Sequence, residues 1–183
     1  DSCYKIKYMF PKSHASAYII AAVRLGWYKV YRPLEYYAAF FTVRGGDIDA
    51  EAAIQGRQLV KIRMEEIKNK GNDRTAKEED QYTSLQILNE MMARGFSFLP
   101  VDLYKSAAAK YLPEDGKLRL PFAALKGLGG NAASALEEAG KQGEYLSADE
   151  ISTRSGVSKA VVDLLRTAGA LDGLPESSQM TFF

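Results

Sequence analysis

The sequence predicts a mainly α-helical fold with a small β-hairpin. Over most of the 183 residues, apolar side chains recur at the three- and four-residue spacing of helices, and glycine or proline stands at the ends of these stretches. Residues 96–120 differ, because apolar and polar side chains alternate there and Glu114, Asp115 and Gly116 form a turn signal. A hydrophobic content of 46% is enough for a buried core.

Two helices are expected at the beginning of the chain. Residues 14–28 are small and apolar, a composition that predicts a closely packed and largely buried helix. Pro33 suits the first turn of a second helix, which Gly45 and Gly46 end.

Two further helices are predicted before residue 96. The first has one apolar stripe and ends at Gly71, and the second begins with a capping box of Thr75 and Glu78 and ends at Gly95. The side chains expected to face the core are Ala53, Val60, Met64, Ile67, Tyr82, Leu85, Leu88 and Met92.

A domain boundary is predicted near Pro100, where the alternating stretch begins. Beyond Pro121 the pattern returns to short helices, and Ser147 with Glu150 fits a second capping box. Three parts are therefore expected: residues 1–99, residues 100–174 and a tail of residues 175–183.

Composition limits the classes of protein that the chain can represent. Its only cysteine, Cys3, excludes an internal disulfide and favours a cytoplasmic location, and no residue set fits a zinc site. The longest apolar run is shorter than the roughly 20 residues that cross a bilayer, so no membrane partner is expected. Net charge is +1, but residues 1–46 carry a net charge of +5. The first residues lack a signal-peptide pattern, and we interpret the chain as a piece of a longer protein.

The most specific local pattern is a glycine hairpin in residues 125–136. Two glycines one residue apart allow a sharp turn, an apolar residue between them plugs the core, and the next helix presents free amides. Free amides at a helix N-terminus bind phosphate, so such a hairpin grips a nucleic-acid backbone rather than a base. The alternative is an ordinary glycine helix cap. The predicted DNA-binding residues here are Lys126, Gly127, Leu128, Gly129, Gly130 and Asn131.

A weaker copy of this pattern follows at residues 154–165. Gly156 keeps the first glycine, but Ser158 replaces the second and Val162 replaces the small residue of the following helix. Two copies in series indicate a unit that contacts both strands of a duplex through Gly156, Ser158 and Lys159. Four cations nearby are candidates for phosphate neutralisation: Lys126, Lys141, Arg154 and Lys159.

A basic aromatic segment, residues 10–18, is the other candidate site. His14 and Tyr18 are one helical turn apart, and with Lys12 they could hold a phosphate chain and stack on a base. The alternative is a histidine that caps a core helix. No acidic pair indicates a catalytic metal site, and no nucleophile with an orienting partner can be named.

Five stretches together resemble a known family, the C-terminal part of the bacterial DNA polymerase III alpha subunit of the PolC type. They are residues 5–18, 36–44, 94–98, 125–136 and 169–172. The resemblance implies that residues 1–99 belong to the helical fingers and residues 100–174 to a duplex-binding domain with helix-hairpin-helix elements. It also implies Mg²⁺-dependent nucleotidyl transfer by palm aspartates that lie upstream, with no catalytic residue, metal or cofactor in this chain.

The resemblance also assigns partners to individual residues. Phe10, Lys12, His14 and Tyr18 would face the incoming deoxynucleotide (dNTP), and the hairpins would hold the primer-template duplex. The last five residues are similar to the peptide by which such polymerases bind the sliding clamp, the beta subunit, and other replisome subunits are further expected partners. In that peptide, Gln179, Met180, Thr181, Phe182 and Phe183, the apolar side chains would fill clamp pockets while the glutamine amide orients them.

Two competing hypotheses remain open at the level of the sequence. A noncatalytic helix-hairpin-helix adapter would bind duplex DNA without sequence preference, and residues 10–18 would be core. A helical protein-interaction domain would have no affinity for DNA at all.

Overall fold

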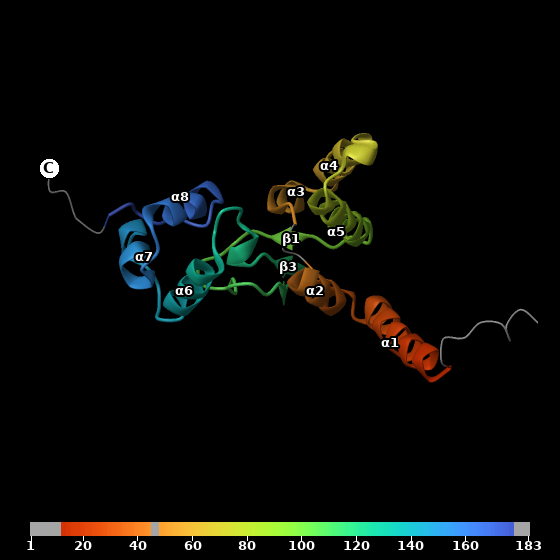
Figure 1. Ribbon diagram of the computed structural model, residues 1–183. Coiled ribbons are helices and arrows are strands. Elements are labelled where there is room, and N and C mark those ends of the chain that lie inside the picture. The colour runs from red at the N-terminus through yellow and green to blue at the C-terminus, as the bar shows by residue number, and fades with distance from the viewer. Residues whose placement is uncertain (1–11, 45–47, 178–183) are drawn as a thin grey trace, which may run out of the picture.

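The computed structural model describes residues 12–44 and 48–177, and of Lys12 and Ser13 only the backbone. These residues form a mostly helical molecule with a small three-stranded sheet at its middle, which confirms the predicted fold class (Figure 1). The α-helices are α1 (Lys12–Tyr31), α2 (Pro33–Arg44), α3 (Ala50–Gln55), α4 (Arg57–Asn69), α5 (Ala76–Ala93), α6 (Gly130–Gly140), α7 (Ala148–Ser155) and α8 (Lys159–Thr167). The short 3₁₀ helices are η3 (Gly71–Asp73) and η4 (Phe122–Ala124), and the strands are β1 (Phe98–Leu99), β2 (Leu112–Glu114) and β3 (Lys117–Arg119).

Local sequence signals account for several helix ends. Pro33 occupies the first position of α2. The capping box before α5 is present, because the Glu78 amide donates to the Thr75 hydroxyl at 3.2 Å and the Thr75 amide donates to the Glu78 carboxylate at 2.9 Å. These signals are local, and so the sequence alone predicts them correctly.

Two helix predictions need correction. The stretch expected to form one helix is divided into α3 and α4 at Gly56, whose φ of +105° is unfavourable for residues with a side chain. The second predicted capping box does not form: the Ser147 hydroxyl is buried without a hydrogen-bond partner, and Glu150 accepts from the Leu146 amide instead.

The sheet has the strand order β1-β3-β2. Asp115 and Gly116 both have positive φ, as the tight turn of a hairpin requires, and this turn joins β2 to β3 as predicted. Strand β1 adds parallel to β3, a pairing that the sequence did not indicate. Arg119 pairs with Glu114 at 2.7 Å, and this bond, with one from Lys105, holds the pKa of Glu114 at about 2.

One apolar core runs from α2 through the sheet to α8. Phe41 of α2 contacts Phe98 and Tyr111, with ring centroids 5.5 and 5.7 Å away, and all three rings are buried. The Tyr111 amide also donates to the Thr42 hydroxyl at 3.1 Å. Buried residues from both sides of residue 100 belong to this one core. The predicted domain boundary near Pro100 therefore stays a proposal.

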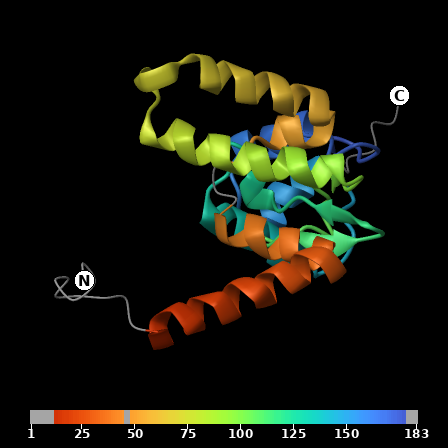
Figure 2. The same ribbon diagram turned by 90° about the vertical axis from the view of Figure 1, so that its right-hand side faces the viewer.

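Helix α1 contradicts the prediction of a largely buried helix. Tyr18, Ile20 and Val23 are 60%, 53% and 66% exposed, and Tyr31 at the other end is 66% exposed. Figures 1 and 2 both place α1 at the edge of the molecule, beside α2. An apolar composition favours burial, but burial also requires a surface against which the helix can pack. The described residues provide such a surface only for the last turns of α1. No helix within residues 12–44 and 48–177 has the length and apolar character to cross a membrane.

Candidate nucleic-acid interface

The first glycine hairpin joins η4 to α6. Gly127 has a φ of +95°, and a Cβ there would make only an ordinary contact with Leu164, so the backbone angle and not lack of space favours glycine. Leu128 is only 6% exposed and plugs the core, as predicted. Gly129 and Gly130 are exposed with open space beside them, which allows another molecule to approach the backbone closely.

The first turn of α6 has unused donors. Its first backbone bond within this part of the chain runs from the Ala133 amide to the Gly129 carbonyl at 3.0 Å. The amides of Gly130, Asn131 and Ala132 therefore have no acceptor among the described residues, and no side chain caps the helix. Together with the positive end of the helix dipole, these donors form a site for an anion.

The second hairpin joins α7 to α8 and repeats this geometry. Gly156 is left-handed with a φ of +70°, and Val157 is 7% exposed, in the place of Leu128. Ser158 precedes α8 with φ and ψ of −71° and 158°, and Gly129 precedes α6 with −72° and 154°. The serine therefore leaves the backbone of the turn unchanged.

The start of α8 also exposes unused donors. The amides of Val161 and Val162 donate to the Ser158 carbonyl, whereas those of Lys159 and Ala160 have no acceptor within the described residues. The Ser158 side chain does not cap the helix. Residues 158–160 are exposed, so this second site is open to a ligand.

Packing holds the two hairpins in one unit. Leu164 of α8 lies 3.6 Å from the position of a Cβ on Gly127, so the second helix pair touches the first turn. Figure 1 shows α6, α7 and α8 side by side, away from α3, α4 and α5. The side chains that fill the space between these three helices are Ala133, Leu136, Ala139, Ile151, Val162 and Leu165, all buried.

The four cations near the hairpins are not equivalent. Lys126 and Lys159 are exposed and form no hydrogen bond or ion pair with other described residues. Lys141 pairs with Glu138 at 2.7 Å and Glu137 at 3.3 Å, and these bonds raise its pKa.

Arg154 has a structural role. Its guanidinium donates to the carbonyl oxygens of Gly143 and Glu144, pairs with Glu150 and lies 4.2 Å from the centre of the Tyr145 ring. Within this unit, Lys126 and Lys159 are therefore the cations best placed for phosphates.

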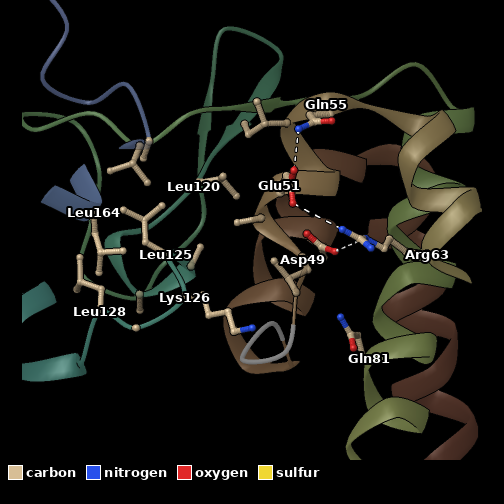
Figure 3. A pocket seen from close by; sticks show the side chains of 18 of the residues that line it. Asp49, Glu51, Gln55, Arg63, Gln81, Leu120, Leu125, Lys126, Leu128 and Leu164 are labelled. Carbon is tan, nitrogen blue, oxygen red and sulfur yellow. Dashed lines mark hydrogen bonds and ion pairs between the residues drawn. The ribbon is translucent and has the colours of Figure 1, made fainter. Parts of the chain in front are cut away.

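A groove of about 1080 Å³ separates the first hairpin from α3, α4 and α5. Figure 3 shows Lys126 and Leu128 on one side and Asp49, Glu51 and Arg63 on the other. Arg63 lies 3.3 Å from Asp49 and 3.7 Å from Glu51, so the acidic side chains of this wall already have a cationic partner. Sequence reasoning missed this groove, because no local pattern connects segments so far apart.

The predicted nucleotide-facing residues are only partly described. The rings of His14 and Tyr18 meet edge to face with centroids 4.4 Å apart, and both side chains are exposed. Lys12 is the first residue of α1, but its side chain lies outside the described residues, as does all of Phe10. The clamp-binding residues, Gln179 to Phe183, also lie outside them. Among residues that are described, no group of three or more His, Cys, Asp or Glu side chains could hold a metal ion.

The two hairpins first indicate the structural class of this region. Residues 95–180 match the family model described as a helix-hairpin-helix motif, so this part of the chain is a helix-hairpin-helix region. The resemblance to PolC-type polymerases is also confirmed. Over all 183 residues, the chain is 44% identical to the DNA polymerase III PolC-type of Listeria innocua, 46% to that of Clostridium perfringens and 44% to that of Bacillus subtilis.

The alignment spans this whole chain but only a small part of each relative. The alignment covers 100% of the chain but 13% of each relative, in the C-terminal region. The chain thus corresponds to the C-terminal part of a PolC-type DNA polymerase III.

Proposed function

We propose that this chain grips the primer-template duplex for a replicative DNA polymerase. The observation that carries the proposal is the pair of matched hairpins, each with a buried apolar plug, free helix amides and an exposed lysine. Amides bind phosphate oxygens without reading bases, which suits an enzyme that must copy any sequence. Two hairpins packed in one unit can contact the phosphates of both strands.

Duplex binding by the chain tests this role. Affinity should be equal for two unrelated duplexes, and the logarithm of the binding constant should fall linearly with that of salt concentration, by about 0.9 per phosphate neutralised. Fluorescence anisotropy over a salt series measures both quantities. Absence of binding at low salt would instead favour the protein-interaction hypothesis.

The catalytic contribution that we propose for this chain is indirect. Phosphoryl transfer in such polymerases would use Mg²⁺ and the palm carboxylates of the preceding polypeptide, and we assign no step of the chemistry to residues of this chain. Primer extension with Mg²⁺ should be absent with the chain alone and present with the full-length polymerase. Extension by the chain alone would overturn this division of roles.

We further propose that the beginning of α1 faces the incoming dNTP. Exposed His14 and Tyr18 in ring contact, one turn from the helix start, could hold a phosphate chain and a base, with Lys12 and Phe10 nearby in sequence. In the full-length polymerase, Lys12→Ala and Tyr18→Ala should raise the KM for dNTP. Tyr31→Ala is the matched control, because this tyrosine is similarly exposed, at 66% against 60% for Tyr18, at the other end of α1. Unchanged kinetics in the first two variants would refute the assignment.

The final pentapeptide is proposed to tether the polymerase to its sliding clamp. Its Met and two Phe side chains would fill apolar pockets, and the Gln179 amide would add an orienting hydrogen bond. Calorimetric titration of the clamp with the chain, and with a version that ends at Ser178, tests this. Binding should disappear with the last five residues, and equal binding by both versions, or by neither, would contradict the tether.

A further inference from the structure

Helix α1 is connected to the rest of the molecule at one end only. Exposed apolar side chains run along its whole length, but Lys29 near its C-terminus reaches α5 and pairs with Glu90 at 2.7 Å. The same ammonium lies 5.5 Å from the centre of the Tyr36 ring of α2. The direction of α1 is therefore determined by contacts around Lys29.

Arg94, directly after α5, makes the contact that ties the α1 backbone to the core. Its Nη1 donates to the Lys29 carbonyl oxygen at 3.0 Å and to the Tyr37 hydroxyl at 3.1 Å. The guanidinium also lies 5.8 Å from the centre of the Tyr37 ring and 6.0 Å from that of Phe96. Tyr37 is fully buried and stacks on Phe41, so Arg94 links a surface helix to a fixed point.

The bend between α1 and α2 explains why the direction of α1 depends on the contacts of Arg94. Arg32 forms a bend between the helices, and Pro33 has no amide proton to continue the hydrogen bonding of α1. Tyr18 lies eleven residues before Lys29, or about 16 Å along the helix at 1.5 Å per residue. A rotation of about 10° at Lys29 would thus displace Tyr18 by about 3 Å.

We propose that Arg94 is a positioning residue for nucleotide binding: by joining the Lys29 carbonyl to the buried Tyr37 hydroxyl, it fixes the direction of α1 and so the place of its N-terminal end. This inference rests on the nucleotide role proposed above for that end. In this proposal Arg94 acts through α1 and makes no contact with the nucleotide. Its planar guanidinium spans main chain, hydroxyl and ring faces together, which a lysine ammonium does not do.

Arg74 provides a matched control. It also donates to main-chain carbonyls, those of Ile67 and Lys68 at 3.0 and 2.9 Å, and also lies over a tyrosine ring, Tyr82, at 5.4 Å. These contacts connect α4 with α5 and do not involve α1. Replacement of Arg74 therefore removes a similar set of arginine contacts from the same protein and leaves the contacts of α1 intact.

The test uses the full-length polymerase with Arg94→Gln and Arg74→Gln. Arg94→Gln should raise the KM for dNTP roughly tenfold, because misplacement of a positioning element by an ångström or more is costly, while duplex affinity stays unchanged. Arg74→Gln should leave that KM unchanged. Tyr37→Phe, which keeps the ring and removes only the hydroxyl, should raise the KM in the same direction by a smaller factor.

Tyr18→Ala separates failure of this inference from failure of the nucleotide role. If Tyr18→Ala raises the KM and a folded Arg94→Gln enzyme keeps the wild-type value, Arg94 does not position α1. If neither variant changes the KM, the nucleotide role fails as well. An equal rise with Arg74→Gln would show a general effect on folding and would also overturn the inference.

Discussion

The two glycine hairpins are nearly the same in backbone and different in sequence. Gly129 and Ser158 precede their helices with φ and ψ values that agree within a few degrees, and Leu128 and Val157 are buried to the same extent. The first turn follows a 3₁₀ helix, however, and the second follows α7 and is held by the Ser152 hydroxyl, which donates to the Val157 carbonyl at 2.6 Å. The motif is thus a backbone arrangement that more than one sequence can form.

The largest expected difference between the hairpins is in stability. Leu128→Ala should lower the free energy of unfolding by about 3 kcal/mol, because a large buried side chain is replaced by a small one. Val157→Ala removes fewer carbon atoms from an equally buried position and should cost about 2 kcal/mol. Urea unfolding measures both, and an equal or larger cost for Val157→Ala would contradict the comparison.

A carboxylate at the second helical position tests whether both hairpins bind phosphate. Asn131→Glu in α6 and Ala160→Glu in α8 should each weaken duplex binding roughly tenfold or more, because a negative charge then faces a phosphate. Stability should be unaffected or slightly higher, since a carboxylate interacts favourably with a helix N-terminus.

Asn131→Gln and Ala160→Gln are the neutral controls for these variants and should bind DNA like the wild type. Anisotropy titrations compare the four. If only Asn131→Glu weakens binding, the second hairpin does not contact the duplex.

The two exposed lysines, Lys126 and Lys159, should contribute a smaller and salt-dependent part of the affinity for duplex DNA. Lys126→Ala and Lys159→Ala should each reduce the slope of log binding constant against log salt by about 1. Lys141→Ala is the control, because this lysine already pairs with Glu137 and Glu138. A larger change of slope for Lys141→Ala than for the other two would show that the duplex lies elsewhere.

The smallest effect is expected for Ser158→Gly. Ser158 has an ordinary negative φ and no capping bond, so glycine should change duplex affinity by less than about twofold and stability by a few tenths of a kcal/mol. A strong gain in affinity would mean that the serine side chain obstructs the second hairpin, contrary to the matched geometry.

These differences explain which features the sequence could predict. The Thr75 capping box, the Asp115-Gly116 turn and the first hairpin depend on residues close together in the chain, and all three are present. The exposure of α1 and the parallel pairing of β1 depend on distant segments, which no local pattern encodes. Ser158 is intermediate: its replacement of glycine is visible in the sequence, but only the φ value shows that it leaves the backbone of the turn unchanged.

The candidate nucleic-acid interface also has features that the sequence could predict and features that it could not. The sequence predicted the turns of both hairpins, since each motif is continuous in the chain, and their contacts with DNA stay a prediction. It could not distinguish free from occupied cations: Arg154 is bound by carbonyls and a ring, while Lys159 five residues later has no such contacts within the described part of the chain. That distinction requires the packing of α6, α7 and α8.

Amide chemical shifts of the isotope-labelled chain, titrated with duplex DNA, test the central claim most directly. We predict that the resonances of Gly130 and Asn131 and those of Lys159 and Ala160 shift together, with the same pattern for two unrelated duplexes. Shifts confined to one hairpin, or absent from both while DNA is bound, would contradict a two-hairpin grip on the phosphate backbone.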